Sequence, residues 1–172
     1  DWGLPGQAAS GPYEDLDAFL HRADELALSL LDEGITAMKI WPFDTFSDKT
    51  NGQYISSEDL ATALEPFRKI RDAVGSDMDI MVELHSRWGV PAAKQIMKAL
   101  DEYQPYWYED ITRADDLGAL RMLSEQTSVP LTISETMAGR ARFRDLLERR
   151  AAGVIMLDLG WCGGISEAKA IA

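Results

Sequence analysis

Cysteine, positive charge and long apolar runs are all scarce in this chain. Its 172 residues include one cysteine, Cys162, so no disulfide can form within the chain, which fits a reducing cytoplasm. Lys and Arg number 17 against 29 Asp and Glu, and the net charge of −12 argues against a surface for nucleic acids or anionic membranes. No apolar run approaches the roughly 18 residues of a membrane span, and no signal peptide is visible. We therefore expect a cytoplasmic protein without nucleic-acid or membrane partners.

Apolar residues make up 46% of the sequence, which is ample for a core. Short apolar runs alternate with amphipathic segments, a pattern typical of a parallel α/β fold. The expected strands cover residues 35–41, 79–84, 105–109, 129–134 and 154–159. The expected helices cover residues 13–33, 57–74 (with Ser57 as N-cap), 91–103, 115–127 and 141–151, and a last helix begins near Gly164 or Ile165. Residues 1–12 are expected to form a loop.

The strand count favours a partial TIM-type (β/α) barrel. A closed barrel of eight units takes about 250 residues, and a helix precedes the first expected strand here. We therefore expect residues 1–172 to be a segment of a longer enzyme, without the first strand and the last two. A doubly wound open sheet is the alternative, but no glycine-rich phosphate turn follows any expected strand.

Three glutamates recur at equal intervals. Glu83, Glu109 and Glu135 are 26 residues apart, and each follows a strand-like run. One strand and one helix account for this period, so the carboxylates should meet at the C-terminal edge of neighbouring strands, where barrel active sites form. Converging carboxylates repel one another, and oxygen ligands favour Mg²⁺ or Mn²⁺. The spacing predicts a metal site.

Other ionisable residues stand at the same strand ends: Lys39, His85, Asp110 and Asp158. If His85 lies two residues after Glu83 on one strand, both side chains point to the same pocket. His85 could instead hold a metal carboxylate in place, and Lys39 could simply pair with the acidic cluster. The polar stretch 43–56 is long for a βα connection, so we expect a mobile loop near the pocket.

The motifs together resemble the barrel domain of the enolase superfamily, in its mandelate racemase/muconate lactonizing enzyme branch. The matching pieces are MKIWP around Lys39, VELHSRWGVPAAK, YWYED, VPLTISE ending at Glu135, and VIMLDLGWCGGI. The resemblance implies that Glu83, Glu109 and Glu135 ligate Mg²⁺. It also implies that an N-terminal capping domain belongs to the whole enzyme and is absent here, and that the enzyme is a homo-oligomer.

Some positions depart from the pattern of the superfamily. Ala37 replaces the first lysine of a common Lys-x-Lys motif, so only Lys39 remains, and the first metal ligand is a glutamate where Asp is common. His85 stands where many relatives have Asn, which resembles galactonate and mannonate dehydratases that act on acid sugars. In relatives, the acid corresponding to Asp158 pairs with a histidine on the seventh strand.

The resemblance implies a lyase that removes the proton α to a carboxylate and eliminates water from an acid sugar. His85, Lys39 and Asp158 are then the candidate catalytic residues. Arg87 and Trp41 are candidates for substrate contact, although core or rim packing is favoured over sugar contact for Trp41. Arg140, like Arg87, is a candidate to bind a second substrate anion, with a surface role as the alternative for both. Two alternatives remain open at this stage: a racemase or epimerase of a hydroxy acid, and a non-catalytic barrel with a structural metal.

Overall fold

A parallel sheet of five strands forms the centre of the computed structural model, which describes residues 15–172. The strands are β1 (Ala37–Ile40), β2 (Asp79–Glu83), β3 (Trp107–Glu109), β4 (Leu131–Ile133) and β5 (Val154–Ile155). Each strand pairs with the next in the sequence, so the sheet order is β1-β2-β3-β4-β5. The structure confirms the expected partial TIM-type barrel. The expected loop at residues 1–12 lies outside the described residues.

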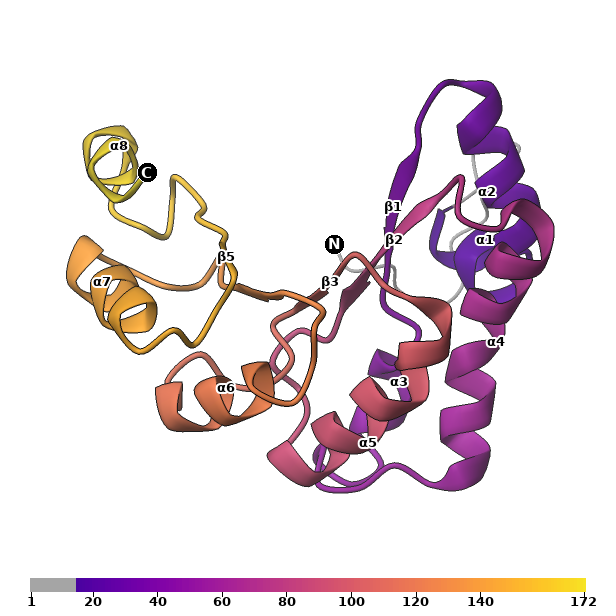
Figure 1. Cartoon of the computed structure of the whole chain (residues 1–172), viewed down its shortest axis with the longest axis horizontal. Coiled ribbons are helices and arrows are strands. Elements are labelled where there is room, and N and C mark those ends of the chain that lie inside the picture. The colour runs from indigo at the N-terminus through magenta and orange to yellow at the C-terminus, as the bar shows by residue number, and fades with distance from the viewer. Residues whose placement is uncertain (1–14) are drawn as a thin grey trace.

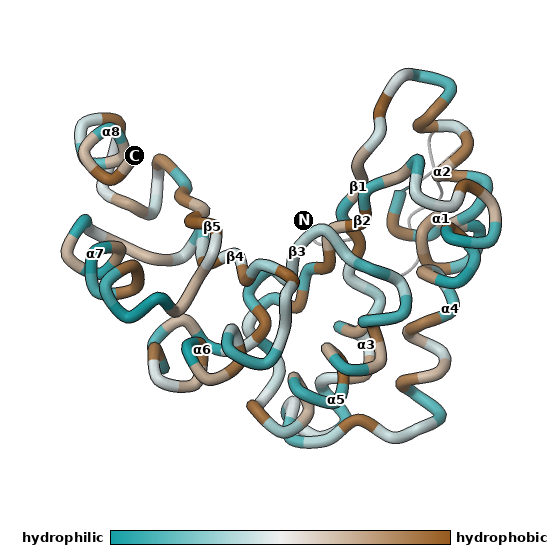
Figure 2. The backbone as a smooth tube through the Cα atoms, viewed as in Figure 1, coloured by the Kyte–Doolittle hydropathy of each residue, from teal (hydrophilic) through white to brown (hydrophobic). Residues whose placement is uncertain are grey.

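The helices lie along the outer side of the curved sheet (Figure 1). They are α1 (Asp15–His21), α2 (Ala23–Asp32), α3 (Asp44–Ser47), α4 (Ser57–Val74), α5 (Val90–Leu100), η1 (Asp101–Tyr103), α6 (Leu117–Ser124), α7 (Arg140–Glu148) and α8 (Ile165–Ile171). Along each helix in Figure 2, apolar stretches alternate with polar ones, as expected when one face is buried. Phe67 and Ile70 of α4 and Ile80 and Val82 of β2 are fully buried members of one apolar core. Each such side chain contributes about 1.5–3 kcal/mol on burial.

The expected helix over 13–33 is two helices in the structure. Arg22 separates α1 from α2 with φ −136° and ψ 45°, outside the helical region. The ammonium of Lys69 on α4 donates a hydrogen bond to the carbonyl of His21 at this break. The apolar pattern continues across the break without glycine or proline, so the sequence carries no local signal for it.

Helix α4 spans the expected residues 57–74, but its N-cap lies one residue earlier than expected. Ser56, and not Ser57, is the N-cap, because its hydroxyl accepts a hydrogen bond from the amide of Asp59 at 3.0 Å. Such a cap satisfies one of the amide groups that the first helical turn leaves without a partner.

The segment 43–56 is more ordered in structure than an irregular loop. It contains the short helix α3, and it buries Phe43, Ser47 and Ile55. Phe43 packs against Phe67 of α4, with ring centroids 6.1 Å apart. The segment does line a cavity beside His85, as described below, while its mobility stays a prediction.

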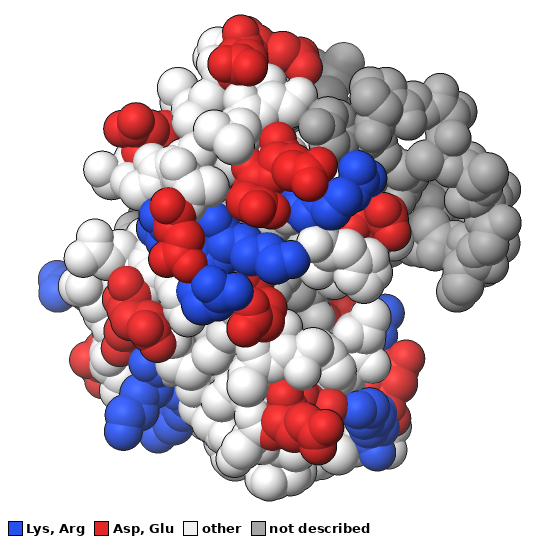
Figure 3. Space-filling model, turned by 90° about the vertical axis from the view of Figure 1, so that its right-hand side faces the viewer, with Lys and Arg blue, Asp and Glu red and all other residues white. Residues whose placement is uncertain are grey.

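Charges of both signs share the face formed by α1, α2 and α4 (Figure 3). Arg68 of α4 lies between two acids of the same helix, 2.7 Å from Glu65 and 2.7 Å from Asp72. Exposed pairs of this kind contribute little stability, because solvent and salt screen their charges. Among the helices of residues 15–172, none combines the length and the apolar character that crossing a membrane requires.

Candidate active site at the strand ends

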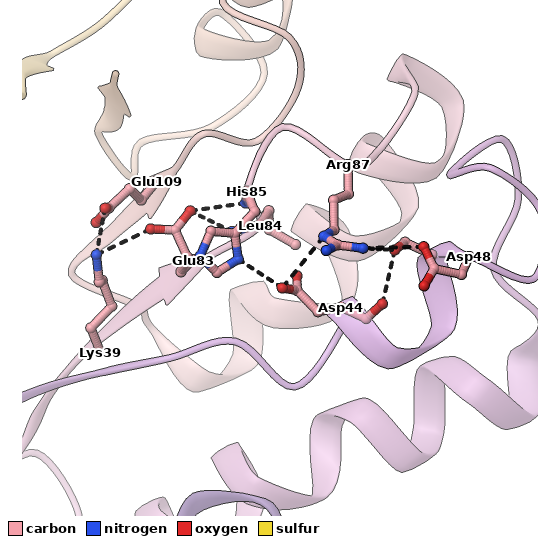
Figure 4. Close-up of polar contacts among 9 residues, drawn as sticks. Lys39, Asp44, Asp48, Glu83, Leu84, His85, Arg87 and Glu109 are labelled. Atoms are coloured by element: carbon pink, nitrogen blue, oxygen red, sulfur yellow. Dashed lines mark hydrogen bonds and ion pairs between the residues drawn. The ribbon is translucent and has the colours of Figure 1, made fainter. Parts of the chain in front are cut away.

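The strand register places Lys39, Glu83 and Glu109 on one face of the sheet (Figure 4). Lys39 pairs with Met81, and Glu83 pairs with Glu109. Because Met81 and Glu83 are two residues apart on β2, the side chains of Lys39, Glu83 and Glu109 lie on the same face of the sheet. The Lys39 ammonium lies 3.1 Å from Glu83 Oε2 and 2.5 Å from Glu109 Oε1. The other face of these strands carries the apolar core. The sequence thus folds two carboxylates and one cation into a single polar cluster.

Burial decides the electrostatics of this cluster. Glu83 and Glu109 are 2% and 1% exposed. Burial raises the pKa of Glu109 to about 7, and the neighbouring Glu83 adds to this effect while Lys39 opposes it. Burial alone would lower the pKa of Lys39, but the hydrogen bond with Glu109 and the charges of both glutamates outweigh it and raise that pKa. Lys39 therefore acts as a cation in this arrangement.

A further buried acid, Asp110, follows Glu109 and contacts the next strand. Its Oδ2 accepts a hydrogen bond from the hydroxyl of Ser134 at 2.9 Å. Burial raises the pKa of Asp110 to about 7, with the charges of Glu135, Glu83 and Glu109 contributing and the Ser134 hydrogen bond opposing. Asp110 therefore lies within the electrostatic field of all three predicted metal ligands.

The three predicted metal ligands do not form a ready-made cluster. Among residues 15–172, no group of three or more His, Cys, Asp or Glu side chains lies close enough to hold a metal ion. Glu83 and Glu109 meet at Lys39, whereas Glu135 follows β4 beyond its last residue, Ile133. Glu135 Oε2 is buried and has no hydrogen-bond partner among the described residues. A buried carboxylate oxygen without a donor, at the same sheet edge as Glu83 and Glu109, fits a site that takes a hard cation.

His85 reaches the pocket by a different route from the expected one. β2 ends at Glu83, and His85 has φ 48°, so the alternation of a strand does not extend to it. Its backbone amide donates to Glu83 Oε1 at 2.9 Å, which turns the side chain toward α3. There its Nδ1 lies 2.7 Å from Oδ2 of Asp44 (Figure 4). The premise of a shared strand face was wrong, although the residue still borders the site.

Asp44 is a site residue that the sequence did not reveal. Burial lowers the pKa of His85, but the hydrogen bond with Asp44 and the charges of Glu83, Asp44 and Glu135 together raise it above its usual value. Asp44 comes 41 residues before His85 in the chain, so only tertiary structure brings the two together. The only available signal was its place just after the first strand.

A cavity of about 470 Å³ opens beside the histidine. Its walls are residues of α1, α3 and two strand ends: Leu16, Leu20, Trp41, Asp44, Thr45, Asp48, His85 and Arg87. The Arg87 guanidinium lies 3.1 Å from Asp48 and 3.6 Å from Asp44, so it is engaged with α3. Trp41 packs edge-on against Phe19 at 4.7 Å between ring centroids. Both predicted substrate contacts thus line the cavity, and their role in binding stays a prediction.

Two further candidates make local contacts. Asp158 Oδ1 accepts hydrogen bonds from the amides of Gly160 and Trp161, at 2.8 and 2.9 Å, in the turn after β5. β5 itself ends at Ile155, so the expected strand over 154–159 is shorter than predicted. Arg140 forms an ion pair with Glu167 of α8 at 2.9 Å. The catalytic role of Asp158 stays a prediction.

Comparison with known proteins agrees with this arrangement of strands. Residues 22–172 match the family described as Enolase C-terminal domain-like. A D-galactonate dehydratase of Klebsiella pneumoniae (strain 342) is 30% identical over 184 residues, covering 99% of this chain and 48% of the relative. The chain therefore spans about half the length of the curated relative that it matches.

Solved structures show the same fold at higher identity. An enolase of the mandelate racemase subgroup from Agrobacterium tumefaciens is 59% identical with a TM-score of 0.85, over 87% of this chain and 42% of that one. An enolase protein from Sargasso Sea environmental sequencing is 48% identical with a TM-score of 0.86, over 89% and 42% of the two chains. With a family match over most of its length, the chain belongs to the enolase C-terminal domain-like family.

Proposed function

We propose that the chain is a segment, residues 1–172, of the barrel catalytic domain of an acid-sugar dehydratase. The observation that supports this proposal best is a buried pair of carboxylates, Glu83 and Glu109, with a histidine, His85, two residues after Glu83 in the chain. Glu83 and Glu109 are held by Lys39, and His85 follows Glu83 at the edge of a cavity. The similarity to D-galactonate dehydratases supports the same reaction class.

Mg²⁺ is the proposed cofactor, with Mn²⁺ as the alternative, and Glu83, Glu109 and Glu135 would hold it. The buried Oε2 of Glu135, which lacks a partner among the described residues, supports its inclusion. When bound, the cation stabilises the negative charge that develops on the substrate carboxylate as the α-proton leaves.

The reaction moves two protons and breaks two bonds. A base takes the α-proton, the C–H electrons form a carbon–carbon double bond, and the β-hydroxyl leaves as water after an acid protonates it. The resulting enol becomes a 2-keto-3-deoxy acid. We propose His85 as one of these two proton-transfer groups, because an imidazole exchanges protons near neutral pH. Lys39 contributes positive charge beside the carboxylates, and Asp158 is proposed as the partner of a second histidine.

The test is a screen of the whole protein against a library of acid sugars that includes D-galactonate. Dehydration yields a 2-keto-3-deoxy acid, which a colorimetric assay for 2-keto acids detects. Formation of a stereoisomer of the substrate without any 2-keto acid would show a racemase or epimerase instead. The absence of any turnover would favour the structural-metal alternative. A homo-oligomeric state and a cytoplasmic location stay predictions.

A further inference from the structure

Two chain segments far apart in sequence are fixed against each other where Asp44 meets His85. The amide of Gly89 donates to the carbonyl of Gly52 at 2.8 Å, and the amide of Gly52 donates to Ser47 of α3. A Cβ atom at Gly52 would lie 1.8 Å from the carbonyl oxygen of Arg87, so only glycine allows this contact. The segment that carries Asp44 is therefore seated directly on the segment that follows β2.

The imidazole of His85 is fixed from several sides. His85 and Ser86 both have left-handed backbone conformations, which fix the direction in which the His85 side chain leaves the backbone. The His85 amide donates a hydrogen bond to Glu83. The ring of Trp41 stands edge-on to it, with ring centroids 6.1 Å apart. Asp44 completes the arrangement at 2.7 Å from Nδ1, and its side chain is only 19% exposed.

The two carboxylate oxygens of Asp44 differ in their contacts. Asp44 Oδ1 is buried and has no hydrogen-bond partner among residues 15–172, while Oδ2 faces both His85 and Arg87. Most buried polar side-chain atoms have a hydrogen-bond partner, so Asp44 Oδ1 is an exception. The hydrogen bond that an imidazole makes through one nitrogen sets which nitrogen carries the proton.

We propose that Asp44 is a positioning residue, which holds the His85 ring in one orientation and one tautomer, with the proton on Nδ1. Any proton that the ring exchanges with a substrate then passes through Nε2. This inference rests on the proposed function for its kinetic consequence, but the tautomer can be measured without any substrate. Asp44 itself does not contact the reacting atoms.

The variants are Asp44→Asn, which keeps the size but can donate to the ring, and Asp44→Glu, which keeps the carboxylate. Asp59→Asn is the matched control, because Asp59 is also 19% exposed and also anchors the segment 43–56, through Lys49 at 2.6 Å. Asp59 does not contact His85. All variants are made in the whole protein, and melting temperatures identify any variant that fails to fold.

The kinetic readout separates positioning from binding. We expect Asp44→Asn to lower kcat by about 10- to 100-fold with KM within about 3-fold, as loss of an orienting partner does. Asp44→Glu should recover part of the rate, and Asp59→Asn should match the wild type. Adding Asp44→Asn to His85→Asn should cause little further loss, since both act through one group. A kcat for Asp44→Asn equal to the control, or a fully additive loss, would overturn the proposal.

The spectroscopic readout uses the ¹⁵N chemical shifts of the neutral imidazole, assigned by comparison with His85→Asn. We expect the Nδ1-protonated form in the wild type and in Asp59→Asn, and a loss of this preference in Asp44→Asn. An unchanged tautomer in Asp44→Asn would overturn the proposal even if its activity falls. If the wild type dehydrates no acid sugar, the proposed function fails, and the tautomer still decides whether Asp44 positions the ring. If Asp44→Asn does not fold, Asp44→Glu carries both readouts.

Discussion

The first three strands and the last two differ in how completely their functional side chains are partnered. At the ends of β1, β2 and β3, Lys39 bridges Glu83 and Glu109, and Asp44 holds His85. After β4, Glu135 keeps a buried oxygen without a partner among the described residues, and after β5 Asp158 only caps a local turn. The pairing of strands follows the same trend, from four residue pairs between β1 and β2 to two between β4 and β5.

The site is therefore preorganised in one half of the sheet. Long, well-paired strands fix where their end residues lie, and polar partners then fix the side chains. The Ser134 hydroxyl links the halves, because it donates to Asp110 across the β3–β4 boundary. In the proposed enzyme, the first half supplies a rigid frame, and Glu135 completes the cation site from the second.

The largest effect is expected from Glu109→Gln, measured as Mg²⁺ affinity by calorimetry on the whole protein. Losing one charged ligand should weaken binding by about 100-fold or more, because even partners of ligands cost about 10- to 100-fold. Glu148→Gln on α7 is the control, since Glu148 is exposed and pairs only with Arg144 among the described residues. An affinity within about 3-fold of wild type would remove Glu109 from the metal site.

A smaller effect is expected from Lys39→Met in the metal-free protein. The change leaves two buried carboxylates without their cation, so the free energy of unfolding should fall by about 1–3 kcal/mol. The Lys39 side chain is 37% exposed, and solvent screening keeps the cost below that of a fully buried pair. Urea unfolding measures it, with Lys169→Met as the exposed control on α8. Equal stability of both variants would show that the cluster does not depend on Lys39.

The smallest effect compares helix caps in the two halves. Ser56 caps α4 and Asp116 caps α6. The side chain of each accepts a hydrogen bond from the backbone amide three residues later, at 3.0 and 2.9 Å. Replacing either residue by alanine should lower the free energy of unfolding by about 1 kcal/mol. Similar losses in one cooperative transition would show that both halves unfold together. Two separate transitions would instead show that the second half is an independent, weaker unit.

Much of the fold could be predicted from the sequence because it depends on local patterns. Periodic apolar residues and capping signals placed every strand and most helices close to where they occur. The break at Arg22 and the helix α3 were missed because contacts with α4, through Lys69 and Phe67, accompany them. Such contacts leave no signal in the local pattern.

The site could be predicted only in part for the same reason. The spacing of 26 residues between Glu83 and Glu109 predicted that both lie at the ends of neighbouring strands, and the structure pairs them directly. The orientation of the His85 side chain could not be predicted, because His85 adopts a left-handed conformation after the end of β2. This conformation interrupts the alternation of side chains on which the prediction relied. The sequence did not predict Asp44 as a site residue, because its contact with His85 joins positions 41 residues apart in the chain.

The central claim is that His85, beside the carboxylate pair, transfers a proton in the reaction. The most direct test is His85→Asn in the whole protein, with kcat for dehydration measured beside a Mg²⁺ titration of the same variant. We expect kcat to fall by about 10²–10⁴-fold, the usual value of acid–base assistance, while Mg²⁺ affinity changes only a few-fold. Activity within a few-fold of wild type, or a collapse of metal binding together with activity, would contradict it.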